Sequence, residues 1–403
     1  MLFHGGFTPE QIFAEHVKWG RRHTGAVTQL PPPTNDRTPD RRLRVGYISP
    51  NFRNQAVLFF VLPILLAHDP WEVEVFCYSD TTVSDDWTAK VRDRADEWRD
   101  TSRLTDEALA RLIRSDHIDI LVELTGHIGD GRLHTLAYKP APVQVSYIGY
   151  QATTGVAAVD YFLSDDWADP AEVADQHYVE RVVRLPKSFF VYAPPPEAPP
   201  VGPLPAIANG FVTFGCQNNL AKVTPRTIAL WSEVLRAVPG SRFVLLAPAS
   251  KEVDDGLLAA FESHGVSRER IEIVRRATPR EYLERYNRID VALDPVPFNG
   301  HTTTCDAAWM GCPTVMRAGD IYANRYGGSV LRNIGCSDLI AEADEDYVRI
   351  GCRLVADLSR LQELRSGLRQ AMERSPITDG KSFTSNLELA YRNMWHSWCA
   401  RTQ

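Results

Sequence analysis

The stretch Asp290-Val-Ala-Leu-Asp294-Pro-Val-Pro-Phe-Asn-Gly-His301-Thr302-Thr303-Thr304-Cys305-Asp306 decides the fold. It predicts a buried strand, then a Pro/Gly loop, then a helix over residues 305–310 that stops at Gly311. A strand that leads through a glycine turn into a helix opened by threonine hydroxyls presents backbone N–H groups and the helix dipole to an anion. The plainer alternative is an ordinary helix N-cap, because threonine is common at that position.

On both sides of this stretch the pattern alternates between strands and helices. In the first half we expect strands at 43–49, 71–78, 118–124 and 143–148, and helices at 8–22, 57–68, 89–98 and 105–115. In the second half we expect strands at 211–214, 242–247, 271–274, 289–293 and 314–316, and helices at 225–238, 282–287, 347–372 and 383–399. Such alternation is typical of doubly wound parallel sheets, so the predicted fold class is α/β with two Rossmann-like domains facing a cleft.

A Pro- and charge-rich linker and a Pro-rich seam suggest where the chain divides. The linker covers 30–42 and the seam covers 193–205. We therefore predict an N-terminal helix and linker (1–42), two Rossmann-like domains (43–200 and 201–375), and a C-terminal helix that packs back across them (376–403). Ligands of open α/β sheets bind at the carboxyl ends of the strands, so the chemistry is expected there.

Composition narrows the possible functions. The 403 residues are 44% hydrophobic and carry a formal net charge of −7, which argues against non-specific nucleic-acid binding. The seven cysteines are scattered without a CxxC pair, so we expect neither a zinc site nor a disulfide framework, and a reducing, cytoplasmic setting. No signal peptide is expected at the N-terminus. The longest apolar run, 56–67, is too short to span a membrane.

Lys222 lies in Gly215-Cys-Gln-Asn-Asn219-Leu-Ala-Lys222-Val-Thr-Pro225, which follows a strand and precedes a helix. An ammonium and amides at a strand end could neutralise a diphosphate charge that grows as a bond breaks. The plainer alternative is a solvated loop lysine.

Two stretches in the first half end in polar loops. Glu123-Leu-Thr-Gly-His127 ends a strand, and His127 could accept a proton from a hydroxyl. Its alternative is a histidine bonded to backbone. The loop Gly149-Tyr-Gln-Ala-Thr153-Thr154-Gly155 could line the same cleft or be a plain turn.

The second half holds another candidate loop, Arg275-Arg-Ala277-Thr-Pro279, followed by Tyr282 and Arg285 on one helix face. Backbone groups in such a loop could contact a nucleobase, although a solvated basic turn is the alternative. Asp306, in the first turn of the organising helix, could bind a sugar hydroxyl or only favour the helix dipole.

Several ordered stretches resemble the catalytic region of the O-GlcNAc transferase family and its relatives, the plant Spindly-type protein O-fucosyltransferases. The matching stretches are Leu43-Arg-Val-Gly-Tyr-Ile-Ser-Pro-Asn-Phe-Arg53, Pro140-Ala-Pro-Val-Gln144, Asn218-Asn-Leu-Ala-Lys-Val-Thr-Pro225, Asn299-Gly-His-Thr-Thr303 and Ala390-Tyr-Arg-Asn-Met-Trp395. The resemblance runs from about residue 8 to the C-terminus. It implies a GT-B, inverting, metal-independent glycosyltransferase that moves a sugar from a nucleotide donor to Ser or Thr of proteins, with domain 43–200 on the acceptor side and 201–375 binding the donor.

The resemblance also implies roles for individual residues. Lys222 would contact the donor diphosphate, and His127 would lie near the acceptor as our candidate general base. The implied donor-site residues are Asn219, Ala277, Tyr282, Arg285, His301, Thr302, Thr303 and Asp306. The acceptor side of the cleft would hold Gln55, Glu123, Thr153 and Thr154.

The chain departs from the family pattern at several positions. Gln55 and Tyr282 stand where the family has histidines, which suggests a reduced turnover or a shifted substrate preference. The tetratricopeptide array that normally precedes the catalytic region is absent from this sequence, and such a region is a possible partner.

We therefore expect transfer of GlcNAc from UDP-GlcNAc to protein hydroxyls, without a cofactor or metal, and with a sugar nucleotide and an acceptor protein or peptide as partners. The alternatives are a protein O-fucosyltransferase that uses GDP-fucose and a catalytically weak sugar-nucleotide binding protein. We expect no nucleic-acid or membrane partner.

Overall fold

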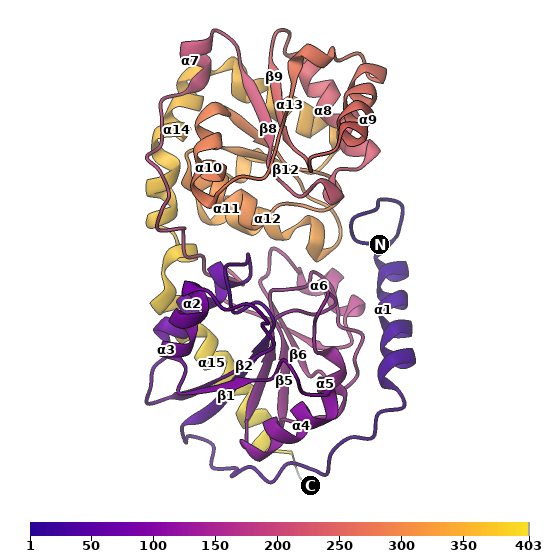
Figure 1. The fold of residues 1–403 in the computed structure, drawn as a ribbon, viewed down its shortest axis with the longest axis vertical. Coiled ribbons are helices and arrows are strands. Elements are labelled where there is room, and N and C mark those ends of the chain that lie inside the picture. Colours follow the sequence, from indigo (N-terminus) through magenta and orange to yellow (C-terminus); the bar gives the residue numbers. More distant parts are fainter. Residues whose placement is uncertain (402–403) are drawn as a thin grey trace. The chain divides into compact units, whose positions relative to one another are not determined.

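A computed structural model describes residues 1–401 and divides by internal contacts into two units (Figure 1). Unit 1 contains Met1–Phe7 and Pro194–Ser375, and unit 2 contains Thr8–Ala193 and Pro376–Gln403. The expected N-terminal helix, linker and C-terminal helix thus join the unit that holds the first sheet. The last two residues of the expected segment 376–403 lie outside the described residues.

Unit 2 is built on a seven-stranded parallel sheet with the order β3-β2-β1-β4-β5-β6-β7. Its strands are β1 (Leu43–Ser49), β2 (Val73–Ser79), β3 (Glu97–Asp100), β4 (Ile120–Glu123), β5 (Val143–Ser146), β6 (Tyr161–Ser164) and β7 (Arg181–Arg184). The central strands are buried on both faces, as their almost continuously apolar sequences require. The order reverses between β1 and β4, where open α/β sheets bind ligands at the strand ends.

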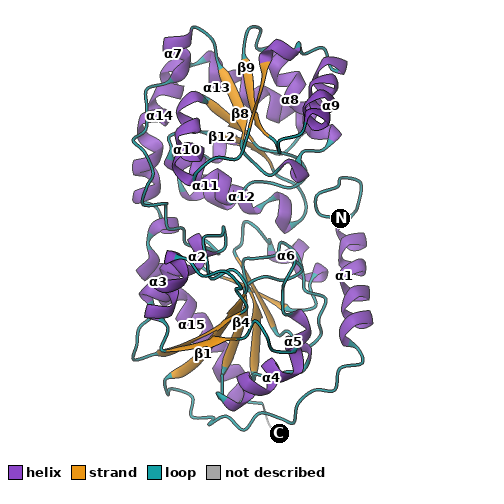
Figure 2. Ribbon diagram, in the orientation of Figure 1, coloured by secondary structure: helices purple, strands orange, loops and turns teal. Residues whose placement is uncertain are grey.

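Helices surround this sheet (Figure 2). They are α1 (Pro9–Thr24), α2 (Leu58–Ala67), α3 (Asp86–Arg94), α4 (Asp106–Ser115), α5 (Leu133–Ala137), α6 (Ala171–Ala174) and α15 (Gly380–Cys399). The start of α1 has a capping box between Thr8 and Gln11, with Pro9 at the first helical position. α15 packs against α2 with its Tyr391 and Trp395 fully buried.

Unit 1 repeats the same winding with six parallel strands in the order β10-β9-β8-β11-β12-β13. They are β8 (Thr213–Cys216), β9 (Arg242–Leu246), β10 (Ile271–Val274), β11 (Val291–Leu293), β12 (Thr314–Arg317) and β13 (Ile340–Ala341). The helices are α7 (Pro205–Asn209), α8 (Pro225–Ala237), α9 (Lys251–Ser263), α10 (Pro279–Glu284), α11 (Thr302–Trp309), α12 (Tyr326–Asn333), α13 (Asp344–Ala356) and α14 (Leu358–Glu373). Here the order reverses between β8 and β11.

The two-domain α/β prediction is confirmed, but several element predictions are wrong. Residues 89–98 are not one helix, because α3 ends at Arg94 and 97–100 form the edge strand β3, whose charged sequence hides its strand character. The expected single helix 347–372 is two helices that meet at Asp357. The helix expected at 305–310 begins three residues earlier, so the threonines lie in its first turn. Strands β6, β7 and β13 and helices α5, α6, α7, α9 and α12 were not predicted.

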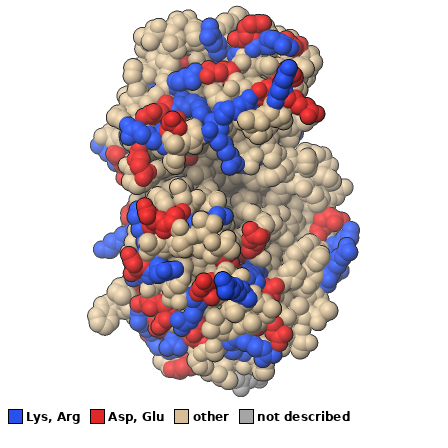
Figure 3. All heavy atoms as spheres, viewed as in Figure 1, with Lys and Arg blue, Asp and Glu red and all other residues tan. Residues whose placement is uncertain are grey.

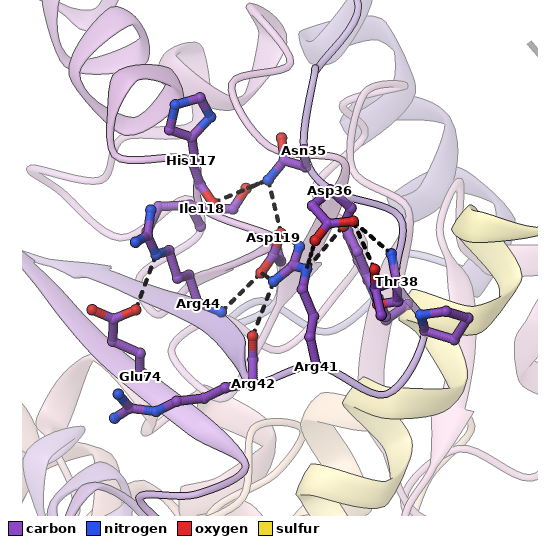
Figure 4. A network of polar contacts seen from close by, with 12 residues as sticks. Asn35, Asp36, Thr38, Arg41, Arg42, Arg44, Glu74, His117, Ile118 and Asp119 are labelled. Carbon is purple, nitrogen blue, oxygen red and sulfur yellow. Dashed lines mark hydrogen bonds and ion pairs between the residues drawn. The ribbon is translucent and has the colours of Figure 1, made fainter.

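The linker 30–42 is held against the sheet of unit 2 by the buried carboxylate of Asp119 (Figure 4). Arg41 donates to both Asp119 oxygens, at 2.7 and 2.5 Å, and the Asn35 amide donates at 2.8 Å. The Arg44 backbone N–H adds a contact of 2.9 Å. The composition of 30–42 predicted a linker. In the structure this linker is fixed, because the buried charge of Asp119 needs the donors that the segment supplies.

Within residues 1–401, no helix is both long and apolar enough to cross a membrane. Figure 3 shows acidic and basic side chains mixed over the visible face, with a group of basic ones on unit 1.

Candidate functional site

The candidate site of unit 1 lies at the carboxyl ends of its central strands. A pocket of about 700 Å³ opens there, lined by residues that follow β8, β9 and β10: Asn219, Leu220, Ala221, Leu246, Ala247, Pro248, Ala249, Arg275 and Arg276. Its size is in the range of small-ligand and cofactor sites, and its walls are mostly apolar. Asn219 caps the short 3₁₀ turn Leu220–Lys222 by accepting from the Ala221 N–H at 3.1 Å.

Lys222 is the last residue of this turn and is half-buried. It donates to the Asn299 carbonyl at 2.7 Å and to the Asn218 Oδ1 at 3.3 Å, and it lies over the Phe298 ring at 4.6 Å. Burial lowers the pKa of Lys222 to about 8, and the Asp294 carboxylate opposes part of that shift. An ammonium has three protons, so one remains for an anionic ligand after these two hydrogen bonds.

The start of α11 is brought next to this lysine. Thr303 Oγ1 donates to the Asn218 Oδ1 at 2.9 Å, the atom that also accepts from Lys222. No threonine is the N-cap, because His301 holds that position and its side chain makes no capping bond. Burial lowers the pKa of His301 to about 3, so its imidazole is neutral. The first-turn N–H groups therefore point outward from a helix end without a side-chain cap, as in anion sites.

Further polar contacts involve Tyr282, Arg285 and Asp306, three of the donor-site residues expected from the sequence. The Tyr282 hydroxyl donates to the Asp306 carboxylate at 3.0 Å and lies 3.2 Å from the Tyr286 hydroxyl. Arg285 donates to the Gln217 Oε1 at 3.0 Å and to the Arg275 carbonyl at 2.9 Å. Tyr282 and Asp306, singled out separately in the sequence, are therefore in direct contact. Ala277 is exposed directly after the pocket-lining Arg276.

In unit 2, His127 follows β4 and is half-buried. Its Nε2 lies 2.8 Å from the Thr154 carbonyl, which can only accept, so Nε2 carries the proton and Nδ1 has the lone pair. Burial lowers the pKa of His127 to about 4, so the ring is neutral and able to take up a proton at Nδ1. The two hypotheses for His127 therefore concern different ring nitrogens. Nε2 makes the hydrogen bond to backbone, and Nδ1 is the nitrogen that could act as a general base.

Aromatic residues that the sequence analysis missed surround His127. The rings of His16 and Trp19 from α1 lie 5.2 and 4.4 Å from it, and Tyr150 lies 4.9 Å from it. His16 also contacts the Tyr150 hydroxyl at 2.7 Å. The sequence feature that could have predicted this contact is the spacing of His16, Trp19 and His23, which places them on one face of a predicted helix.

The other unit 2 candidates are mostly engaged in supporting their loops. The buried Glu123 accepts from the Thr125 and Gly126 N–H groups at 2.9 and 2.7 Å, and burial raises its pKa to about 7. Thr153 and Thr154 are buried and both hydroxyls donate to Glu180, which the sequence analysis did not single out. Gln55, by contrast, is exposed just before α2.

The architecture corresponds to a known fold class. Two α/β units with parallel sheets, each with its strand order reversed at the centre, are the architecture of the GT-B fold. The sucrose-phosphate synthase of Thermosynechococcus elongatus shares this fold with a TM-score of 0.57 at 12% identity over 88% of this chain and the whole of that one. A glycosyltransferase of Rickettsia africae gives 0.54 at 10% identity, over 88% of this chain and 98% of that one.

Within this class the chain belongs to glycosyl transferase family 41, whose profile matches residues 27–193 and 204–387. It is 38% identical to a lysine-to-methionine mutant of the Thermobaculum terrenum O-GlcNAc transferase, with a TM-score of 0.94 over 98% of this chain and 76% of that one. A barley protein named as a probable UDP-N-acetylglucosamine–peptide N-acetylglucosaminyltransferase, SPINDLY, is 40% identical over 97% of this chain. The Arabidopsis protein SEC, named for the same activity, is 31% identical over 90%. The chain spans 42% of the barley protein and 38% of SEC.

Proposed function

We propose that the chain transfers GlcNAc from UDP-GlcNAc to Ser or Thr hydroxyls of proteins, with inversion at the anomeric carbon. The observation that carries this proposal is the junction of Lys222 with the start of α11, beside a pocket of nucleotide size. It is supported by 38% identity to an O-GlcNAc transferase along 98% of the chain. Curated relatives named as UDP-GlcNAc-dependent peptide transferases add further support.

The proposed mechanism is direct displacement by the acceptor hydroxyl. Negative charge develops on the leaving diphosphate as the glycosidic bond breaks, and the Lys222 ammonium and the α11 N-terminus would stabilise that charge. Nδ1 of the neutral His127 would accept the proton of the attacking hydroxyl. Asp306 and Tyr282 would hold the nucleoside from one side of the pocket, with Asn219, Ala277 and Arg285 around it.

Because these groups supply the positive charge, the proposed reaction requires no metal ion or other cofactor. The test is transfer in the presence of a chelator, which should leave the rate unchanged. A loss of activity restored by added Mg²⁺ would contradict this part of the proposal.

We further propose a cytoplasmic site of action, in keeping with seven cysteines that are all free.

Donor identity is tested by comparing UDP-GlcNAc and GDP-fucose. The protein is incubated with each donor and a peptide library, and sugar transfer and donor hydrolysis are measured by mass spectrometry. GlcNAc transfer supports the proposal, whereas fucose transfer alone would assign the chain to the fucosyl branch. Tight UDP binding without transfer or hydrolysis would indicate a sugar-nucleotide binding protein. In that case Gln55→His and Tyr282→His, alone and together, would show whether the two departures abolish turnover.

A further inference from the structure

We propose that Asp294 and Asn218 form a positioning pair that orients Lys222 and the start of α11 toward the donor diphosphate. Asp294 directly follows β11 and Asn218 closely follows β8, so the pair joins the two strands at which the sheet order reverses. Both side chains are buried. The inference rests on the proposed function and assigns a role to two residues that touch no substrate in it.

The contacts of Asp294 determine which way its partner faces. The carboxylate accepts from the Gly300 N–H at 2.9 Å through both oxygens and from the Asn218 Nδ2 at 3.2 Å. A carboxylate oxygen can only accept, so the nitrogen end of the Asn218 amide must face it. The oxygen end then faces the opposite way, toward Lys222 and Thr303.

That single Asn218 oxygen joins the two parts of the proposed diphosphate site. It accepts from the Lys222 ammonium at 3.3 Å and from the Thr303 hydroxyl at 2.9 Å. The Asp294 carboxylate also fixes the loop before α11 by accepting from the Gly300 N–H. This N–H belongs to the same peptide group as the Asn299 carbonyl, to which Lys222 donates at 2.7 Å. A Cβ at Gly300 would lie 2.8 Å from the carboxylate and 2.3 Å from the Thr303 hydroxyl, so a side chain at this position would displace these groups.

Asp294 also supplies the charge that keeps the lysine protonated. The titratable groups facing Lys222 are Asp294, Cys216 and His301. Burial raises the pKa of Cys216 to about 12 and lowers the pKa of His301 to about 3, so both are neutral. Burial raises the pKa of Asp294 to about 7, and the Lys222 ammonium and the Gly300 N–H oppose part of that shift, so at pH 7.5 Asp294 is the main anionic group among the three. Its removal should lower the pKa of Lys222 further.

An exchange of the two side chains tests the pair. With Asp294→Asn, an amide NH₂ must face either the Gly300 N–H or the Asn218 amide nitrogen, so one contact is lost. With Asn218→Asp, two carboxylates meet. In the double variant Asp294→Asn/Asn218→Asp an amide again meets a carboxylate, with the remaining carboxylate oxygen toward Lys222.

The experiment is calorimetry of the full chain with UDP and with GDP at pH 7.5. Each single variant should bind the diphosphates about tenfold or more weakly, the size expected for a charge-assisted hydrogen bond. The double variant should bind at least threefold more tightly than the weaker single variant. A double loss equal to the product of the single losses would overturn the inference.

Two further variants keep the test informative. Asp290→Asn changes a buried aspartate at the other end of β11 that accepts from the Ala206 and Thr213 N–H groups, and it should leave UDP affinity unchanged. Asn218→Ala leaves the Asp294 charge in place and should still weaken UDP binding, which separates orientation from charge if Asp294→Asn does not fold. Wild-type affinity in Asn218→Ala would refute the pair alone. A wild-type protein that binds neither UDP nor GDP would refute the proposed function as well.

The pH profile provides a readout that a purely structural role would not change. UDP affinity is measured as a function of pH above 7, where it should fall as Lys222 loses its proton. The midpoint of this fall should move to lower pH in Asp294→Asn and should not move in Asp290→Asn. An unmoved midpoint in Asp294→Asn would contradict the electrostatic part of the role.

Discussion

Strands β4 and β11 hold the same place in their sheets, and each has an acidic residue at both ends. Asp119 and Asp290 precede the strands, and Glu123 and Asp294 stand at the opposite ends. The residues at the strand starts fix chain segments: Asp119 holds the linker, and Asp290 accepts from two backbone N–H groups. At the strand ends the two units differ.

Glu123 accepts from the Thr125 and Gly126 N–H groups of its own turn, whereas Asp294 connects through Asn218 to an ammonium and to a helix start. An acidic residue at the corresponding strand end thus supports a turn in unit 2 and connects to the candidate diphosphate site in unit 1. The difference teaches that burial and a raised pKa do not by themselves mark a functional carboxylate. What distinguishes Asp294 is that its partner Asn218 in turn contacts the Lys222 ammonium and Thr303 at the start of α11.

The largest effect on stability is expected at Asp119. Asp119→Ala leaves the Arg41 guanidinium and the Asn35 amide without their buried acceptor, and should lower the free energy of unfolding by about 3–5 kcal/mol. Urea denaturation measures this loss. UDP affinity should be unchanged at temperatures where the variant is folded, and a specific loss of UDP binding would show that the two strand ends are not independent.

Glu123→Gln should alter the pH dependence of stability instead of donor binding. The pKa of Glu123 is about 7 in the folded protein, above its usual value, so the folded state binds the proton more tightly. Wild-type stability therefore falls as pH rises from about 4.5 to about 7, by about 3 kcal/mol from this residue. The variant should lack this contribution when denaturation is compared at pH 5 and pH 8. An unchanged slope would mean that Glu123 titrates normally.

Lys222→Arg should change how donor binding depends on pH. The pKa of Lys222 is about 8, so the ammonium loses its proton at higher pH and wild-type UDP affinity should fall by up to about tenfold per pH unit above that value. A guanidinium stays charged over this range, so the slope should disappear even if affinity at pH 7 is lower. The same slope in both proteins would assign the titration to another group.

The smallest effect is expected at the exposed rim of the Asp119 network. Glu74 pairs with Arg44 at 2.9 Å where both side chains are partly exposed (Figure 4). Glu74→Ala should therefore lower the free energy of unfolding by less than about 1 kcal/mol. A loss as large as that of Asp119→Ala would show that the network acts as one unit.

Much of the fold could be predicted because its apolar strands and helix caps are local signals. The strand 43–49 is found as expected, and Thr8 and Thr105 cap the helices that were predicted to begin at those residues. The edge strand 97–100 was missed because its residues are polar and its pairing with β2 is not local. The end of the helix at Arg94 was missed for the same reason.

For the site, the sequence analysis singled out residues whose type suggests chemistry, such as Lys222 and His127. It missed residues whose role depends on orientation across the fold. Asp294 was recognised as the end of a strand, but only the structure places its carboxylate against the Asn218 amide. Thr153 and Thr154 show the converse, since their hydroxyls are used by Glu180, a residue 26 or more positions away along the chain.

The central claim is that unit 1 binds a nucleotide-sugar diphosphate through Lys222 and the start of α11. Calorimetric titration of UDP into the wild-type protein and Lys222→Met at pH 7 tests it most directly, because methionine retains length and removes the charge. We predict binding by the wild type and a loss of about a hundredfold or more in the variant, the size expected for a buried charge–charge contact. Equal affinities in the two folded proteins would contradict the account.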